Sequence, residues 1–561
     1  MSSKITIKKT KGIDLNDITN TQKLDDLVNE MLEQIEERPN DYELKETHQF
    51  VMILPEKYWG PGSYDRWIRV GWALKNTSTK LLPCWLKFSS QSKEFHFNDI
   101  AKIVDMWNKF DYDNPDGLTA RSIMYWAKND NIIQYKKVRE ETVSHYIDLT
   151  IQNATEFDFA QVLYQMRKDE FVCVSIQKSV WYEYHGNRWY EIDSGNSLRL
   201  AISKCMHDIY MKKTQDSMEQ LQKMDQTEDN YEVLRKRSNK LADLCIFLKK
   251  TTWKNNIMRE AKELFYDRYF VNKLDQNPYL LCFNNFVVDF KEKTWRNGQP
   301  DDYISKCTNI DLIPYNEIKG SETENDINKF IDQLFPDESL KKYMWQHLAS
   351  TLIGNNDNQT FNMYTGSGRN GKSKLVDLMS KTLGDYKATV PITLLTQKRN
   401  QIGSTSSEIV QLMGVRYAVM QEPSKGEKIN EGITWRRIRV CDFISKFLEN
   451  PYGDEQKFPK EDYPYQYEMD KHIDEKFSIW APVLASMLVN ITFKKMGSVT
   501  DCDIVLASSE QYREGQDYLA EFCKDKIKKV HGSKGIKKTE LVEEFRQWYT
   551  TNYGKGLPKA R

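Results

Sequence analysis

Residues 366–373, GSGRNGKS, have the composition and spacing of a loop that binds phosphate. They fit the pattern G-x-x-x-x-G-K-[ST], in which backbone N–H groups and a helix N-terminus hold phosphate oxygens. The apolar stretch TFNMYTG before the loop predicts a strand, and KSKLVDLMSKTLGDY after it predicts an amphipathic helix. In that setting Lys372 reaches the β- and γ-phosphates of a nucleotide, and Ser373 ligates Mg²⁺. The predicted nucleotide-contacting residues are Gly366, Ser367, Gly368, Arg369, Asn370, Gly371, Lys372, Ser373 and Lys374.

A second acidic site is needed if the nucleotide is hydrolysed, and Glu422 is the candidate for it. The apolar residues Val415 to Met420 predict a strand that ends in Gln421-Glu422. A carboxylate at the end of a strand beside the phosphate loop can hold Mg²⁺ through water and polarise the attacking water. The alternative is that Glu422 is an exposed acid on a loop.

Three arginines stand at the start of a further predicted strand, in TWRRIRVCDF. They are Arg436, Arg437 and Arg439. An arginine that reaches across a subunit boundary can stabilise charge on a phosphoryl group in transfer. The alternative is that these are surface arginines on an edge strand.

The length of 561 residues predicts three or four domains. Six of the fourteen tryptophans fall between Trp59 and Trp126. The stretch SYDRWIRVGWALKNTS repeats its apolar residues at helical spacing, which favours a helical core over a base-stacking surface. VWYEYHGNRWYEID alternates aromatic and polar residues around Gly-Asn, which predicts a β-hairpin. The predicted segments are a charged, mobile arm (1–50), a helical module (51–150), an α+β domain (151–315), the domain with the phosphate loop (316–510) and a basic tail (511–561).

The formal charge is zero, from 81 Lys and Arg against 81 Asp and Glu, which excludes a surface that is basic throughout. The nine cysteines form no C-x-x-C pair, which argues against a zinc site or a disulfide framework and favours a reducing compartment. No apolar run approaches the roughly 20 residues that span a membrane. No apolar signal core follows the N-terminus either, so neither a membrane partner nor secretion is expected.

The tail is locally basic and therefore predicts contact with nucleic-acid phosphates. Within the same tail, TELVEEFRQWYTTNYG follows the lysines and places Leu541, Phe545 and Trp548 on one face of a helix. The candidate DNA-binding lysines are Lys524, Lys526, Lys528, Lys529, Lys534, Lys537 and Lys538.

GSGRNGKSK, RYAVMQEPSKGEKINEG and TWRRIRVCDF, in this order, resemble superfamily 3 helicases, specifically the poxvirus-type primase–helicases of nucleocytoplasmic large DNA viruses. Upstream, SYDRWIRVGWALKN and LTARSIMYWAKND resemble the primase C-terminal module of that group. HGNRWYEID, LDQNPYLLCFNN and GQPDDYISKCT are similar to the domain just before its ATPase. The resemblance covers roughly residues 55–515.

The resemblance implies an α/β P-loop ATPase domain of AAA+-like superfamily 3 type, preceded by α-helical and α+β domains and followed by a winged-helix-like segment. It implies an ATP- and Mg²⁺-dependent DNA helicase, a hexameric ring that translocates on single-stranded DNA at the replication fork. Lys372, Glu422, Arg436 and Arg437 are then catalytic, with the arginine supplied in trans. The implied partners are DNA, further copies of the chain and other viral replication proteins, and the implied location is a cytoplasmic replication factory of the host, or the virion.

The sequence departs from this family at two places. Gln421 stands where many members carry a second acid. Only Pro423 to Thr434 lie between Glu422 and Trp435, where the family has several tens of residues with a polar sensor strand and a DNA-contacting hairpin. One parallel crossover takes a dozen or more residues, so an internal segment near 433–434 is predicted to be missing.

The gap leaves a second function open: a nucleotide-binding, non-unwinding DNA-binding or assembly subunit, or a decayed or shortened helicase. A small-molecule P-loop kinase has no lid or acceptor-site pattern to support it. Priming is not expected either, because a primase palm needs paired acids on a strand. Asp111 and Asp113 of FDYDNPDG lie instead in a polar turn.

Overall fold

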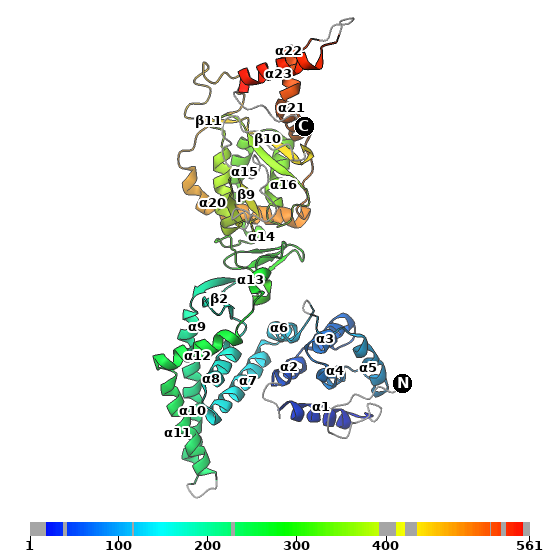
Figure 1. Ribbon diagram of the computed structural model, residues 1–561, viewed down its shortest axis with the longest axis vertical. Coiled ribbons are helices and arrows are strands. Elements are labelled where there is room, and N and C mark those ends of the chain that lie inside the picture. Colours follow the sequence, from blue (N-terminus) through cyan, green and yellow to red (C-terminus); the bar gives the residue numbers. More distant parts are fainter. Residues whose placement is uncertain are drawn as a thin grey trace. The chain divides into compact units, whose positions relative to one another are not determined.

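The computed structural model divides the chain into two compact units (Figure 1). Unit 1 comprises Met1–Lys168 and Gly195–Tyr266, and unit 2 comprises Asp169–Ser194 and Asp267–Arg561. The predicted 151–315 domain is therefore shared between the two units. The structure describes residues 18–36, 42–114, 117–225, 230–391, 411–420, 435–516, 518–528 and 535–553.

Unit 1 is helical in its described residues, and its core is rich in aromatic side chains. Trp85 and Trp107 are fully buried with their ring centroids 5.7 Å apart, and Trp67 stacks on Trp85 at 4.7 Å. Gly71 permits this packing, because a Cβ at Gly71 would lie 2.7 Å from the Trp85 ring. The prediction that these tryptophans form a core is thus confirmed for Trp85 and Trp107, whereas Trp72 is 45% exposed.

The helices of unit 1 in Figure 1 are α1 (Thr21–Glu36), α2 (Tyr42–Met52), α3 (Tyr64–Thr77), α4 (Leu82–Ser89), α5 (Ile100–Lys109), α6 (Ala120–Asp130), α7 (Ile132–Gln152), α8 (Glu156–Arg167), α9 (Asn196–Ala201), α10 (His207–Lys223), α11 (Tyr231–Phe247) and α12 (Thr251–Leu264). Asp111 and Asp113 follow α5 in an exposed turn and lie on no strand, as the sequence predicted.

Unit 2 begins with two antiparallel three-stranded sheets. The first contains β1 (Phe171–Ser175), β2 (Val180–His185) and β3 (Arg188–Asp193). The predicted hairpin is confirmed, with Val180 opposite Asp193 and His185 opposite Arg188 around the Gly186-Asn187 turn. The second sheet contains β4 (Leu280–Cys282), β5 (Val287–Asp289) and β6 (Thr294–Arg296), and the short helix α13 (Phe270–Lys273) lies between the two sheets in the sequence.

The rest of unit 2 is largely helical, and two of its helices, α15 and α16, begin at side-chain caps. Ser321 accepts a hydrogen bond from the Glu324 N–H at the start of α15, and Asp337 accepts from Ser339 and Leu340 at the start of α16. The helices are α14 (Tyr315–Ile318), α15 (Glu322–Leu334), α16 (Glu338–Ser350), α17 (Lys372–Leu383), α20 (Ile473–Lys495), α21 (Asp503–Gln516), α22 (Tyr518–Lys526) and α23 (Lys538–Tyr553).

The strands of this region form three separate parallel pairs, which join β7 (Phe361–Thr365) to β10 (Ile438–Asp442), β8 (Lys387–Thr389) to β9 (Tyr417–Val419), and β11 (Lys446–Leu448) to β12 (Gln466–Glu468). Within the described ranges, β7 is paired on one edge only. Its five residues are all half-buried, whereas a strand inside a parallel sheet is normally buried on both faces. The residues 421–434, where the sequence predicts the missing segment, lie outside the described part of the chain.

One helix of the described chain, α20, is long and apolar enough to cross a membrane by length and composition. The expectation that no apolar run approaches this length overlooked it. Of its most apolar window, 61% is buried, and it packs against α15, α16 and α17 with Leu484 and Leu488 fully buried. A helix that contacts neighbours on several sides is apolar around most of its surface, which is the character of a core helix.

Candidate functional site

The loop between β7 and α17 has a conformation that requires its glycines. Gly366 has φ 130° and Gly371, which precedes α17, has φ 80°, and both values lie in the region that favours glycine. A Cβ at Gly366 would lie 2.6 Å from the Phe443 carbonyl oxygen, and one at Gly371 would lie 2.4 Å from Leu334. The predicted strand, loop and helix are therefore present, and the N-terminus of α17 follows the loop directly.

The side chains of the loop separate into an anchored residue and exposed ones. Asn370 is buried; its side chain donates to the Phe443 carbonyl oxygen (3.4 Å) and accepts from the Lys372 N–H (3.4 Å). Lys372 Nζ donates to the Gly366 carbonyl oxygen at 2.6 Å, which holds the ammonium group across the mouth of the loop. Partial burial lowers the pKa of Lys372. Exposed residues 366–369 and 373 leave the backbone and the Ser373 hydroxyl open to an incoming anion and its metal.

Lys374, the last of the predicted contact residues, is engaged elsewhere. Its ammonium group forms an ion pair with Asp474, at the start of α20, with an N–O distance of 2.6 Å. The predicted set is therefore brought together from Gly366 to Ser373, whereas the Lys374 side chain links α17 to α20.

Residues 443–447, which follow β10, run beside the loop and hold it. The Phe443 N–H donates to the Thr365 carbonyl oxygen (3.0 Å), and the Phe447 N–H donates to that of Arg369 (2.8 Å). Between them, Lys446 Nζ donates to Ser367 Oγ (2.6 Å) and to the Gly368 carbonyl oxygen (2.7 Å). Lys446 is 3% exposed, and burial together with the charges of Lys372 and Arg369 lowers its pKa.

Sequence reasoning missed Lys446. The available signal was the parallel pairing of β10 with β7, which places Ile438 opposite Phe361 and Asp442 opposite Thr365. Residues that follow parallel neighbouring strands meet at the same edge of a sheet. The same signal would have indicated Asp442, which accepts a hydrogen bond from the Thr365 hydroxyl at that edge.

The predicted arginines differ in what they contact. Arg439 forms an ion pair with Asp501 at 2.8 Å, so its guanidinium is occupied within the unit. Arg436 and Arg437 are exposed at the start of β10, and neither forms an ion pair with any residue in the described ranges. The prediction of an arginine that acts across a subunit boundary therefore stays with Arg436 and Arg437.

The acidic half of the predicted site is outside the described residues, because Gln421 and Glu422 both fall in the 421–434 range. The described residues contain no group of three or more His, Cys, Asp or Glu side chains that could hold a metal ion. Mg²⁺ bound to a nucleotide commonly uses only one or two protein oxygens beside phosphate oxygens and water. The exposed Ser373 hydroxyl in the first turn of α17 fits that requirement.

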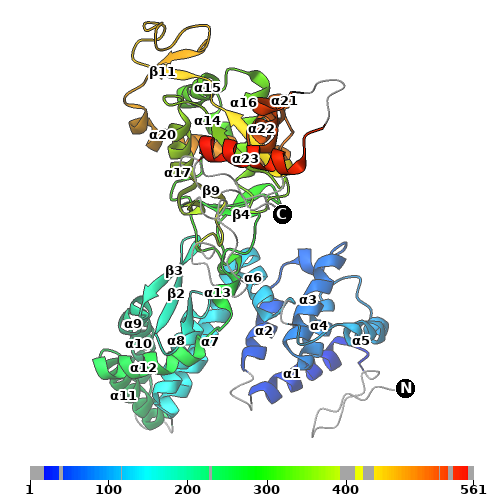
Figure 2. The ribbon, with the colours of Figure 1, turned by 45° about the horizontal axis from the view of Figure 1, so that its top comes forward.

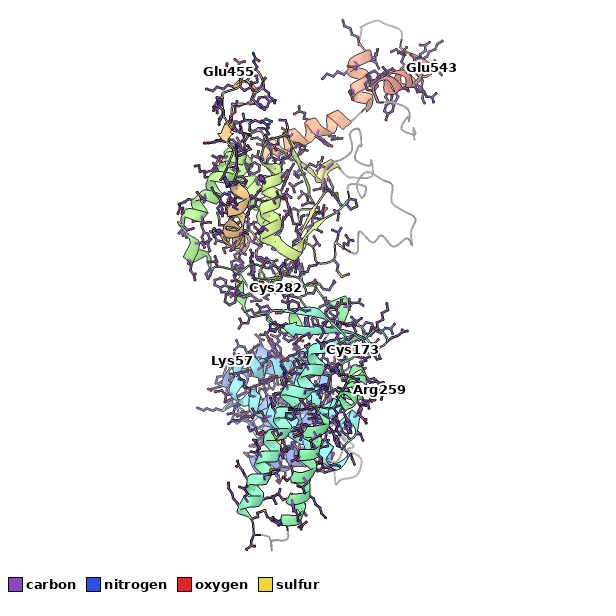
Figure 3. All side chains as sticks on the ribbon, turned by 90° about the vertical axis from the view of Figure 1, so that its left-hand side faces the viewer. Lys57, Cys173, Arg259, Cys282, Glu455 and Glu543 are labelled. Atoms are coloured by element: carbon purple, nitrogen blue, oxygen red, sulfur yellow. The ribbon has the colours of Figure 1, made fainter. Side chains whose placement is uncertain are left out.

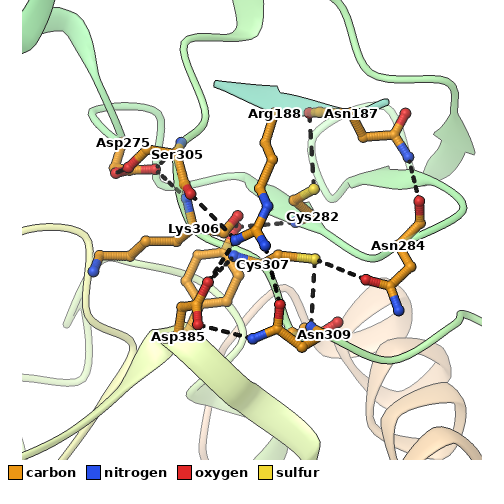
Figure 4. A network of polar contacts seen from close by, with 12 residues as sticks. Asn187, Arg188, Asp275, Cys282, Asn284, Ser305, Lys306, Cys307, Asn309 and Asp385 are labelled. Atoms are coloured by element: carbon orange, nitrogen blue, oxygen red, sulfur yellow. Dashed lines mark hydrogen bonds and ion pairs between the residues drawn. The ribbon is translucent and has the colours of Figure 1, made fainter. Parts of the chain in front are cut away.

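A polar network fixes the other end of α17 (Figure 4). Asp385, just after the helix, accepts hydrogen bonds from Arg188 at the hairpin tip (2.6 Å), from Asn309 (2.8 Å) and from the Cys307 N–H (3.1 Å). The neighbouring Cys282 thiol lowers the pKa of Cys307. Figure 3 labels Cys282, which belongs to unit 2. All nine cysteines of the chain are free thiols. The residue that follows the phosphate-loop helix thus contacts the β2–β3 hairpin and residues 307–309.

The basic tail folds around a small aromatic cluster of its own, and Figure 2 shows α22 beside α23. Phe522 of α22 packs against Trp548 and Tyr549, with Leu541 and Phe545 at the edge, so the predicted apolar face of this helix is confirmed. The candidate DNA-binding lysines in the described ranges are all exposed, namely Lys524, Lys526, Lys528, Lys537 and Lys538, whereas Lys529 and Lys534 lie outside those ranges.

Comparison with known families finds two matches. Residues 51–127 match the family model described as "Primase C terminal 2 (PriCT-2)", and residues 160–336 match "D5 N terminal like". Both matches fall where the sequence suggested the primase C-terminal module and the domain before the ATPase.

Relatives of the chain occur in several large DNA viruses. It is 29% identical to "Putative helicase L207/L206" of Acanthamoeba polyphaga mimivirus, over 89% of this chain and 56% of that protein. It is 24% identical to "Putative primase C962R" of African swine fever virus (91% and 60%) and 24% identical to "Putative helicase 022R" of Frog virus 3 (65% and 46%). The chain thus spans about half to three-fifths of the length of these relatives. The chain is thus similar to proteins of large DNA viruses that are named putative helicases or putative primases, and it matches the primase C terminal 2 model followed by the D5 N terminal like model.

Proposed function

We propose that the chain is the ATP-hydrolysing part of a DNA helicase that acts in viral genome replication. The observation that carries this proposal is the loop 366–373 with Lys372 folded over it, between a strand and a helix N-terminus. An ATP triphosphate would accept from the loop N–H groups and from Lys372, with Mg²⁺ held by Ser373, phosphate oxygens and, through water, Glu422. The names of the relatives support a helicase rather than another class of P-loop protein.

The proposed fold of this part is the AAA+-like P-loop fold of superfamily 3. Support comes from β10, which lies parallel beside β7 and begins directly after the two exposed arginines. Arginines with no described partner in their own molecule suit a site completed by a neighbouring copy, so we propose a ring, of six subunits as the resemblance implies. Such a ring would move on single-stranded DNA alongside other viral replication proteins, in a cytoplasmic factory of the host or from the virion.

A second candidate function is that of a nucleotide-binding assembly subunit that does not unwind DNA. One observation favours it: β7 is paired on a single edge within the described residues, although the phosphate-loop strand is expected inside its sheet. If the strand beside β7 is missing, the polar sensor residue expected at the end of that strand is missing too.

ATP turnover with and without single-stranded DNA distinguishes the two functions. For a helicase, we expect turnover to rise several-fold with saturating single-stranded DNA, and a forked duplex to be separated only when ATP and Mg²⁺ are present. The measurement pairs phosphate release with a fluorescent strand-separation assay on the same preparation. ATP binding with a turnover that does not change when DNA is added would support the assembly subunit. A protein that does not bind ATP would contradict both proposed functions.

Salt dependence tests the proposed contact between the tail and DNA. Each phosphate neutralised on a single strand contributes about −0.7 to the slope of log affinity against log salt. Replacing Lys526 and Lys528 with Gln should therefore reduce the slope by about 1.4 if both contact phosphates. A matched control replaces Lys494 and Lys495, two exposed lysines at the end of α20, with Gln. Equal slopes for the two double variants, measured by fluorescence anisotropy, would remove the tail from the DNA interface.

A further inference from the structure

Lys446 is a buried cation that lies against the phosphate loop. Its Nζ contacts Ser367 Oγ and the Gly368 carbonyl oxygen, in the first half of the loop, whereas Lys372 contacts Gly366 from the helix. The rings of Tyr463 and Phe458 cover it at 5.1 and 5.6 Å from their centroids. These rings belong to the connection between β11 and β12 on which Figure 3 labels Glu455.

The Glu449 carboxylate interacts electrostatically with Arg369, but no carboxylate in the described ranges forms an ion pair with Lys372 or Lys446. Arg369, Lys372 and Lys446 form no ion pair there. The acids that follow in the sequence are occupied, since Glu449 pairs with Lys471 at 2.8 Å and Asp474 pairs with Lys374. Asp442 accepts the hydroxyl of Thr365. Three cations therefore converge on one exposed loop whose N–H groups also attract anions.

The hydrogen bonds of Lys446 leave part of its capacity unused. An ammonium group has three donors, and two of them are taken by Ser367 and Gly368. Burying an ammonium group beside neutral oxygens and other cations is costly, because its hydration is lost without an opposite charge. The cation–π contacts with Tyr463 and Phe458 offset only part of that loss. An anion that enters the loop would supply the missing charge and accept the third donor.

We propose that Lys446 is a second phosphate-contacting lysine, which binds the terminal phosphate of a nucleoside triphosphate in the loop. This inference rests on the proposed ATP site. Lys372 reaches the β- and γ-phosphates from the helix N-terminus, with Ser373 on Mg²⁺, and Lys446 adds a second cation on the terminal phosphate from Ser367 and Gly368. Lys446 thereby makes the site favour a triphosphate over a diphosphate, although it lies 74 positions beyond the loop's own lysine in the sequence.

Nucleotide affinities of Lys446→Met test the inference. Calorimetric titration with a non-hydrolysable ATP analogue and with ADP, each with Mg²⁺, gives a Kd for each ligand. We expect the analogue to bind at least about tenfold more weakly and ADP to change less than threefold, as expected for loss of one charge-assisted contact to the third phosphate. The matched control is Lys460→Met, an exposed lysine on the same connection that also lies over a ring, that of Tyr452, and it should leave both values unchanged.

The outcomes separate the inference from the proposed function. Wild-type protein that binds neither ligand contradicts the ATP site itself. If the wild type binds both ligands and Lys446→Met loses affinity for both equally, Lys446 only supports the loop and the inference is overturned. Unchanged affinity for both ligands would overturn it too. If Lys446→Met melts at a lower temperature, Lys446→Gln replaces it, since its amide can donate to the loop without charge. Selective loss of the analogue in Lys446→Gln supports the inference, and retention of wild-type selectivity overturns it.

Discussion

Replacement of Lys372 by alanine is expected to reduce ATP turnover by at least about 100-fold, the scale seen when one preorganised donor to a reacting centre is removed. The Lys372 ammonium group is held 2.6 Å from the Gly366 carbonyl oxygen, across the mouth of the loop, where the outer phosphates of a nucleotide would enter. Alanine leaves the helix propensity of this position intact, so the loss reports on the charge rather than on α17. Phosphate release at saturating ATP, together with a direct binding titration, measures the effect.

Lys374→Ala provides the matched control two residues further along the same helix. Its ammonium group pairs with Asp474 at the surface, and such exposed pairs contribute about 0–1 kcal/mol to stability. We expect this variant to keep at least half of the wild-type turnover and its melting temperature to fall only slightly. Turnover that survives in Lys372→Ala, or is lost equally in both variants, would contradict the assignment of the loop as the nucleotide site.

The second large effect is expected at Arg436 and Arg437. If one of them stabilises the transferring phosphoryl group of a neighbouring subunit, the Arg436→Ala/Arg437→Ala double variant should lose about 10³-fold or more in turnover. Nucleotide affinity should change far less, because the loop of each subunit is intact. Both guanidinium groups are exposed, so their removal is not expected to disturb the core. The two single variants then identify which arginine carries the effect.

Mixing two inactive variants tests whether the arginine acts in trans. Lys372→Ala retains both arginines, and the double arginine variant retains the loop, so a mixed ring contains some complete sites. Turnover should therefore reappear when the two are combined and pass through a maximum near equal amounts. Arg439→Ala serves as the control, because Arg439 is paired with Asp501 within its own molecule. The ATP turnover of Arg439→Ala mixed with Lys372→Ala should equal that of wild type mixed with Lys372→Ala. A mixture of the first two variants that stays inactive would exclude a contribution in trans.

Features encoded in short stretches of sequence could be predicted. The loop 366–373, the hairpin around Gly186-Asn187 and the apolar face of α23 each depend on residues that are close in the chain, and the structure has all three. The pattern of glycines marks two of the three loop positions with φ above zero, Gly366 and Gly371, and the third is Arg369.

Contacts between distant segments could not be predicted. In the sequence, nothing distinguishes Lys446 from a surface lysine. The pairing of β10 with β7 brings it to Ser367, which is 79 residues away. The core position of α20 depends on three helices earlier in the chain, which is why its apolar length was overlooked. Glu422 stays a prediction, since it lies outside the described residues, and so do the predicted domain boundaries.

The contact between Arg188 and Asp385 can form only after the ribosome has synthesised both residues. The two residues are 197 positions apart, and a ribosome that adds about 5–20 residues per second needs about 10–40 s to cover that distance. In that interval the nascent β1–β3 hairpin has been made but its acceptor has not, while the helices of residues 195–266 emerge and can fold first. The contact that joins the hairpin to the residues after α17 therefore forms late in synthesis, and a ribosomal stall between the two residues would leave the hairpin tip without this partner.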